Sequence, residues 1–138
     1  MSNAASFVLF PLAERRFAVP AEQVAELALP GRLQTFPHST AGLSGVLLRR
    51  GRIVPVCDIA PRLIGPKAPA GRFYLMAHVE SRRDEWTAIP VTGECELAAC
   101  EVAQPTAGSP AYVVGTLTRG EERIAVIDLQ KLLSEEVH

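Results

Sequence analysis

Side chains that could carry catalytic or metal chemistry are sparse in this chain of 138 residues. The three histidines lie far apart in the sequence, at His38, His78 and His138. Cys95 and Cys100 are near each other, but no second pair accompanies them, and a structural zinc site takes four ligands. Cys57 lies in an apolar run, which favours a small core residue over a nucleophile. The sequence therefore predicts no enzyme, no metal site and no cofactor.

One cationic turn is a candidate for partner recognition. Arg49, Arg50 and Arg52 surround Gly51, a residue that tight turns favour. Arginines in such a turn could donate hydrogen bonds to a partner's carboxylates or backbone carbonyls. The alternative is an ordinary solvated turn, and the residue types alone do not decide between the two.

These side chains must be positioned by an internal repeat with a spacing of 70 residues. Between positions 18 and 63, 14 of 46 residues are identical to the residue 70 places later. Such self-similarity predicts two similar subdomains packed on each other. The matched pairs include Pro20 with Pro90, Glu26 with Glu96, Gly45 with Gly115, Arg49 with Arg119, and Asp58 with Asp128.

Strand patterns dominate both copies. Short apolar runs separated by polar turns predict two hairpins in each copy. The segment 21–29 and its partner 91–99 fit either a short helix or a bent strand. The predicted strands are 7–10 and 17–20, then 45–48 and 53–57, and in the second copy 73–76 and 86–90, then 112–117 and 123–127.

Two aspartates predict where helices begin. Asp58 and Asp128 each follow a predicted return strand and precede apolar residues, as helix N-caps do. Because Pro61 interrupts the first helix, we expect a single turn there. The second, over 129–136, carries leucines on one face.

A stretch rich in proline and glycine at 65–71 predicts the boundary between the copies. We therefore expect one domain over 1–138, with barrel subdomains at 7–64 and 72–135, and the N-terminal strand able to cross to the other barrel. Short strands separated by frequent turns predict a mainly all-β fold of two small five-stranded antiparallel barrels. Since either half alone would be marginally stable, they should share a core.

The composition is that of an ordinary globular protein, with 48% hydrophobic and 21% charged residues. A net charge of −1 argues against broad attraction to nucleic acid or anionic lipid. No apolar run is long enough to span a membrane, and the first residues lack the pattern of a signal peptide. Three cysteines without framework spacing fit a reducing compartment, so we expect a cytoplasmic protein.

The run 45–59, GVLLRRGRIVPVCDI, resembles the signature of the CheW family of bacterial chemotaxis adaptors. It matches a Gly-Val strand, an Arg-Gly turn, a Val-Pro-Val return strand and an Asp-Leu step. The segment 24–27 is similar to the family's Val-x-Glu-Ile, and the match extends to Leu133. Leu48 and Arg49 depart from the family, which commonly has Asn and Leu there.

The resemblance implies two SH3-like barrels side by side in a non-catalytic adaptor. It implies that the adaptor couples the cytoplasmic tip of chemoreceptors to the regulatory domain of a CheA-type histidine kinase. Two faces would dock on the kinase, and a groove between the barrels would take the receptor. By position, Arg50 matches the arginine of the family's turn, and Val24 and Glu26 match its Val-x-Glu.

The repeat separates residues that build the fold from those free to recognise a partner. Arg50 is matched by Gly120 and Val24 by Glu94, which favours copy-specific, partner-binding roles. Arg52 lies in the same basic turn and is also expected to bind a partner. Glu26 is either a rim contact or a structural ion-pair partner, and its twin favours the latter. Shared or turn-forming residues are expected to be structural: Gly45, Gly51, Asp58, Asp128, Pro20 and Pro90.

Other readings remain open from the sequence. The array served could drive flagellar chemotaxis or pilus-based twitching. An alternative of another class is a β-barrel module that binds nucleic acid or a small ligand. The near-neutral charge and the scarcity of aromatic residues weigh against nucleic acid.

Overall fold

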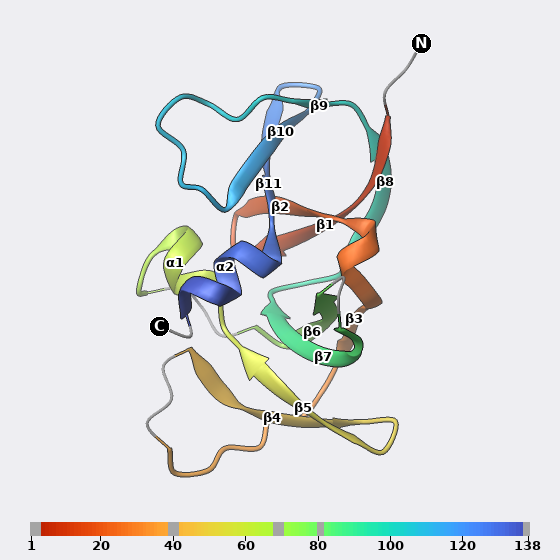
Figure 1. Cartoon of the computed structure of the whole chain (residues 1–138), viewed down its shortest axis with the longest axis vertical. Helices are drawn as coiled ribbons and strands as arrows, with labels where there is room; N and C mark the ends of the chain where they lie inside the picture. The colour runs from red at the N-terminus through yellow and green to blue at the C-terminus, as the bar shows by residue number, and fades with distance from the viewer. Residues whose placement is uncertain (1–3, 39–41, 68–70, 80–81, 137–138) are drawn as a thin grey trace.

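The computed structural model describes residues 4–38, 42–67, 71–79 and 82–136. Two curled β-sheets pack together, with a short helix from each half of the chain beside their junction (Figure 1). No helix among the described residues is long and apolar enough to cross a membrane. The mainly all-β prediction, with two similar subdomains and a short C-terminal helix, is confirmed.

Apart from η1 in the first half and β9 in the second, the strands and helices follow one another in the same order in the two halves. The first half holds β1 (Ala5–Leu12), β2 (Arg15–Pro20), the 3₁₀ turn η1 (Ala21–Gln23), β3 (Val24–Pro30), β4 (Leu43–Arg49), β5 (Arg52–Cys57) and α1 (Ala60–Ile64). The second half holds β6 (Phe73–Val79), β7 (Arg82–Val91), β8 (Glu96–Cys100), β9 (Val102–Ala103), β10 (Val113–Arg119), β11 (Glu122–Ile127) and α2 (Leu129–Glu136).

The two halves exchange their first hairpins. One sheet has the order β8-β1-β2-β11-β10-β9, so the N-terminal hairpin lies among strands of the second half. The other has the order β3-β6-β7-β5-β4, so the hairpin β6-β7 lies among strands of the first. The sheets therefore do not follow the predicted ranges 7–64 and 72–135: the whole N-terminal hairpin crosses, and β6-β7 crosses in return.

The exchange keeps the register of the repeat. In one sheet Val56 pairs in parallel with Ala88, and in the other Val126 pairs in parallel with Ala18. Each pair is the other shifted by 70 residues. The barrels are thus not wholly antiparallel, because each contains one parallel contact where an exchanged hairpin meets its host. One sheet also has six strands when the two-residue β9 is included.

Alternating side chains on the exchanged strands produce three apolar clusters. Phe7 and Leu9 point into one barrel, whereas Val8 and Phe10 point into a core shared by both sheets. On β6, likewise, Tyr74 lies in the other barrel and its neighbour in the shared core. The expected common core exists, and each cluster draws on both halves of the chain.

The segment 21–29 combines the two structures that its pattern allowed. It begins with η1 and continues as the strand β3, which pairs with β6. Its counterpart in the second copy contains β8, which pairs with β1. The equivalent strands β3 and β8 therefore each pair with a strand of an exchanged hairpin.

Candidate functional site

Three charged residues gather at the tip of the β4-β5 hairpin in the first barrel, the one built from β3-β6-β7-β5-β4. Arg49 donates two hydrogen bonds to Glu26 on β3, Nε to Oε1 at 2.9 Å and Nη2 to Oε2 at 3.3 Å. Arg50 adds an ion pair from Nη2 to Oε2 at 2.8 Å. We call Glu26, Arg49 and Arg50 the Glu26 cluster. One carboxylate thus binds two guanidinium groups, and Glu26 is an ion-pair partner within the fold.

Exposure differs sharply within the Glu26 cluster. The Glu26 side chain is 15% exposed and Arg49 is 32% exposed, whereas Arg50 is 67% exposed. The hydrogen bond from Arg49 and, secondarily, the charges of both arginines lower the pKa of Glu26. The carboxylate is therefore ionised at neutral pH, and it anchors an arginine that remains accessible.

Arg50 has a backbone conformation that arginine seldom adopts. Arg49 pairs with Arg52, which leaves a two-residue loop of Arg50 (φ 54°) and Gly51 (φ 76°). Positive φ at both positions is the hallmark of a type I′ turn, which prefers Asn or Gly at its first position. A non-glycine residue with this backbone costs roughly 1–3 kcal/mol, and such strain clusters at functional sites.

The second barrel repeats the inner ion pair and omits the outer one. Arg119 donates to Glu96 as Arg49 does to Glu26, 70 residues earlier. Gly120 (φ 61°) takes the place of Arg50 and has no side chain that could pair with Glu96. Both copies keep the inner pair, whereas Arg50 is an addition of the first copy.

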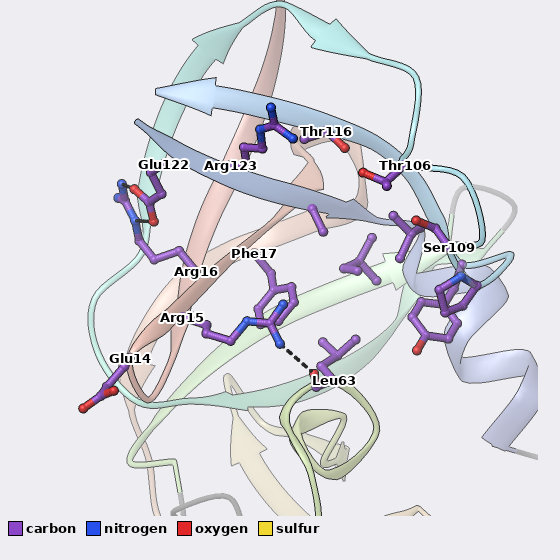
Figure 2. Close-up of a pocket in the computed structure, with 15 residues that line it drawn as sticks. Glu14, Arg15, Arg16, Phe17, Leu63, Thr106, Ser109, Thr116, Glu122 and Arg123 are labelled. Atoms are coloured by element: carbon purple, nitrogen blue, oxygen red, sulfur yellow. Dashed lines mark hydrogen bonds and ion pairs between the residues drawn. The ribbon is translucent and has the colours of Figure 1, made fainter. Parts of the chain in front are cut away.

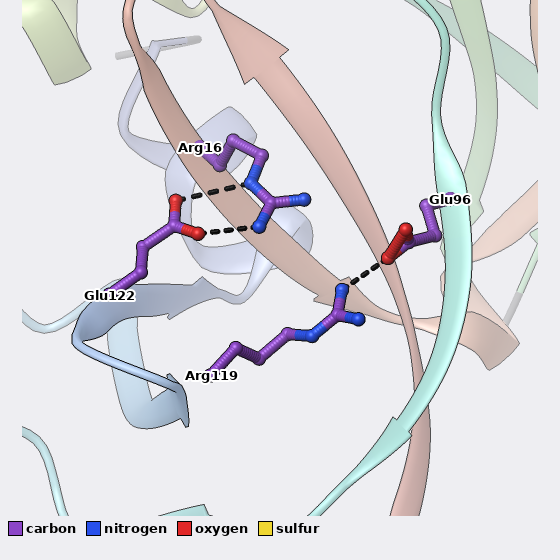
Figure 3. A network of polar contacts seen from close by, with 4 residues as sticks. All are labelled: Arg16, Glu96, Arg119 and Glu122. Atoms are coloured by element: carbon purple, nitrogen blue, oxygen red, sulfur yellow. Dashed lines mark hydrogen bonds and ion pairs between the residues drawn. The ribbon is translucent and has the colours of Figure 1, made fainter.

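A neighbouring ion pair ties the exchanged hairpin to its host sheet. Arg16 on β2 donates Nε to Oε2 of Glu122 on β11 at 3.1 Å, beside the Arg119–Glu96 pair (Figure 3). The hydrogen bond from Arg16 lowers the pKa of Glu122. The same bond raises the pKa of Arg16. These side chains join strands that are 106 residues apart in sequence.

Arg52 points away from the Glu26 cluster. Its Nη1 donates to the carbonyl of Asp84 at 3.1 Å, and its guanidinium lies 5.1 Å from the centre of the Trp86 ring. These contacts join β5 to the exchanged strand β7. Arg52 and Trp86 correspond in the repeat to Glu122 and Arg16. A pair of long side chains therefore links β5 to β7 in one barrel and β11 to β2 in the other.

Val24 lies apart from the turn. It is half-buried at the start of β3, pairs with Ala77 and packs on the shared core. It shares its strand with Glu26, two residues on. The structure therefore brings Arg50 and Glu26 together and leaves Val24 and Arg52 at separate places.

Gly45 and Gly115 occupy equivalent close approaches. A Cβ on Gly45 would lie 2.4 Å from the carbonyl oxygen of Gln34, whose backbone forms a bridge with Val46. A Cβ on Gly115 would lie 2.4 Å from Cγ2 of Val102 on β9. In both barrels a crossing segment passes directly over the strand at the glycine.

The two aspartates behave differently. Oδ1 of Asp128 accepts from the N–H of Lys131 at 3.3 Å, an N-cap geometry, and Gln23 reaches the same helix end by accepting from the N–H of Leu129 at 3.1 Å. Oδ1 of Asp58 accepts from the N–H of Ala60 at 3.1 Å, but the N-cap of α1 is Ile59. The predicted cap at Asp58 is thus displaced by one residue.

The prolines differ as well. Pro20 is the last residue of β2, whereas Pro90 is buried within β7, one residue before its end. Gly51 faces open space.

An exposed apolar pair escaped the sequence analysis. Leu48 and Ile53 face each other across the β4-β5 hairpin and are 63% and 71% exposed. Their counterparts, Thr118 and Arg123, are polar. A comparison of the copies at strand positions would have found them, because a shared fold does not demand apolar side chains there. Together with Arg50 they form a surface that the second barrel lacks.

Among the described residues, no group of three or more His, Cys, Asp or Glu side chains gathers as a metal site would require. The three cysteines are not joined in disulfides and are half-buried. Cys57 and Cys95 pack against the shared core, and Cys100 packs on the cluster inside the second-half barrel.

Comparison with known proteins gives a consistent answer. The probable chemotaxis protein CheW of Rhizobium etli (strain ATCC 51251 / DSM 11541 / JCM 21823 / NBRC 15573 / CFN 42) is 25% identical over 134 residues, covering 93% of this chain and 86% of that protein. The crystal structure of the scaffolding protein TtCheW from Thermoanaerobacter tengcongensis has the same fold, with a TM-score of 0.78, 20% identity, and coverage of 94% of this chain and 92% of that one. The model of the CheW-like domain matches residues 6–137, and the chain therefore belongs to the CheW-like domain family.

Proposed function

We propose that this protein is a non-catalytic cytoplasmic adaptor that couples chemoreceptors to a CheA-type histidine kinase. Membership of the CheW-like family and similarity to a probable chemotaxis protein support an adaptor of chemotaxis signalling. The kinase's regulatory domain and the receptor's cytoplasmic tip are the proposed partners. The output is either flagellar chemotaxis or pilus-based twitching.

The observation that carries this proposal is that two equivalent hairpin tips bear different side chains. The β4-β5 tip bears an exposed arginine on a strained backbone beside Leu48 and Ile53. The β10-β11 tip has Gly120 instead and polar flanks. An exposed arginine on the same hairpin as exposed apolar side chains is typical of the residues that dominate protein interfaces. An adaptor that meets unlike partners needs such a difference between its two barrels.

Glu26 supports the site by holding Arg50 in place. The ion pair restrains the Arg50 side chain before binding, which lowers the entropy lost when a partner is engaged. Arg49 pairs with the same carboxylate, so Glu26 keeps an ion-pair partner when Arg50 turns to another protein. A partner carboxylate or backbone carbonyl could then accept from the remaining Arg50 N–H groups.

Co-purification with the kinase's regulatory domain, and separately with a receptor tip fragment, tests the proposal. The wild-type chain should bind at least one of them. Arg50→Asp should reduce that binding at least tenfold, since a charge is reversed at the contact. The matched control is Gly120→Asp, which places the same side chain at the equivalent position of the other hairpin and should leave this binding intact.

The outcomes separate the function from the site. If the wild-type chain binds neither partner, the proposed function is wrong. Binding that survives Arg50→Asp removes Arg50 from the site while the adaptor role stands. Circular dichroism melts of both variants establish that each is folded.

A further inference from the structure

A groove opens beside the junction of β2 and β11, away from the Glu26 cluster (Figure 2). Its cavity has a volume of about 520 Å³, within the range of small-molecule sites. Phe17, Leu63 and Tyr112 supply apolar and aromatic walls. We call this cavity the β2–β11 groove.

Arg15 and Arg123 give the groove its cationic character. The Arg15 guanidinium lies 4.8 Å from the centre of the Phe17 ring, and its Nη1 donates to the carbonyl of Leu63 at 3.3 Å. This fixes the guanidinium in the groove and leaves further N–H groups for a ligand. The Arg123 side chain is exposed and makes no hydrogen bond or ion pair with any other described residue.

Hydroxyl groups occupy another part of the lining. In Figure 2, Thr116 lies next to Arg123, and Thr106 and Ser109 lie on the side of the groove opposite Glu14. Hydroxyls and guanidinium groups together are the donors that bind phosphate and carboxylate oxygens.

The two acidic residues of the lining do not cancel this character. Glu122 is engaged by Arg16, which holds its charge at one end of the groove. Glu14 points outward, away from the hydroxyl groups (Figure 2). The cations Arg15 and Arg123 therefore face the cavity without a carboxylate between them.

The fold does not require these side chains. At the equivalent junction of β5 and β7, a groove of about 520 Å³ also exists. There Ile53 stands in place of Arg123, Thr87 in place of Phe17 and Glu85 in place of Arg15. The same scaffold thus carries a groove with Arg15 and Arg123 in one barrel, and in the other a groove whose lining has Arg52 together with Asp84 and Glu85.

We propose that the β2–β11 groove binds a small polyanion, a molecule with at least two negatively charged phosphate or carboxylate groups. Arg15 and Arg123 bind the charged oxygens, and the hydroxyls of Thr106 and Ser109 donate the remaining hydrogen bonds. This site shares no residue with the Glu26 cluster, so its test is separate from the test of that cluster.

Isothermal titration calorimetry with pyrophosphate and with citrate, at constant ionic strength, tests the proposal on the full chain. Saturable binding of one molar equivalent of either anion is expected. Pyrophosphate binding alone identifies a phosphate site, and citrate binding alone identifies a carboxylate site. The absence of saturable binding of both anions overturns the proposal.

Arg123→Ala should weaken binding about 10- to 100-fold, which corresponds to the loss of a charged hydrogen bond. Because the Arg123 side chain is exposed and makes no hydrogen bond or ion pair with other described residues, this variant should fold normally. The control is Lys67→Ala, which removes an exposed cation outside the groove and should change the affinity less than twofold. Equal losses in the two variants would show that the attraction is only general charge, and would overturn the site.

Discussion

Arg50 and Glu26 are joined by an ion pair of 2.8 Å that has no equivalent in the second barrel. Gly120 stands where a second such arginine would be, although Glu96 and Arg119 repeat the rest of the arrangement. Both barrels thus keep the inner ion pair, and they differ in whether an arginine or a glycine follows it. That difference makes the contribution of Arg50 separable from the contribution of the fold.

Arg50→Asn should leave the free energy of unfolding within about 1 kcal/mol of the wild-type value. The variant loses an exposed ion pair, worth about 0–1 kcal/mol, but asparagine adopts the left-handed turn more readily than arginine. Partner binding should nevertheless fall. Urea unfolding and a pull-down on the same preparation check both. A loss of several kcal/mol would instead identify Arg50 as structural.

Glu26→Gln should make the protein less stable at neutral pH and less sensitive to acid. The folded-state pKa of Glu26 is lowered chiefly by the hydrogen bond from Arg49, so its ionised form stabilises the fold. That stabilisation is present above the unfolded pKa, which is near 4.5, and is lost as pH falls through the lower folded value. Thermal melts from pH 7 to pH 3 should show a smaller decline in the variant.

Glu96→Gln is the matched control for this experiment, because it removes the equivalent carboxylate of the second barrel. Its side chain is 47% exposed, against 15% for Glu26, so solvent screens the ion pair and the cost should stay below about 1 kcal/mol. Equal acid sensitivity of the two variants would contradict a special contribution from the Glu26 cluster.

Gly45→Ala should destabilise the fold more than Gly115→Ala. The new Cβ at position 45 meets a backbone oxygen at 2.4 Å, which only a backbone shift relieves, at about 1–3 kcal/mol. At position 115 the nearest atom ends the Val102 side chain, which can rotate away. Urea unfolding of both variants measures the difference. A folded Gly45→Ala protein of normal stability that no longer binds a partner would assign Gly45 to recognition.

Fragments 1–70 and 71–138 should not fold as monomers but should assemble when mixed. Each sheet needs a hairpin from the other fragment, and each apolar cluster contains side chains of both. Circular dichroism and light scattering, before and after mixing, check this. A cooperative melt from either fragment as a monomer would contradict the dependence on exchange.

Local patterns predicted most strands, because alternating apolar residues and turn residues act over short distances. They could not predict that β1 and β2 lie beside β8 and β11. A hairpin has the same pattern whichever sheet receives it, so its host depends on contacts between residues far apart in sequence. The expectation that the N-terminal strand can cross to the other barrel agrees better with the structure than the two sequential ranges do. Local patterns could not predict that β6-β7 crosses in return.

The part of the candidate site that could be predicted is the part that a comparison of the two copies reveals. The pairing of Glu26 with Arg49 follows the conservation of both residues in the second copy, and the exception at Arg50 marked it as copy-specific. Leu48 and Ile53 were not found, because an apolar residue in a strand reads as core until its exposure is known. The contact of Arg52 with Trp86 joins the two halves and has no signal in either alone.

The exchange of hairpins also constrains how the chain acquires its structure during synthesis. The N-terminal hairpin leaves the ribosome first, yet its partner Glu122 is made 106 residues later than Arg16. Neither sheet can be completed until most of the polypeptide has emerged, so the nascent first half carries unpaired strand edges for most of its synthesis. High contact order slows folding, and the protein is thus expected to fold late, in one concerted step after translation rather than barrel by barrel.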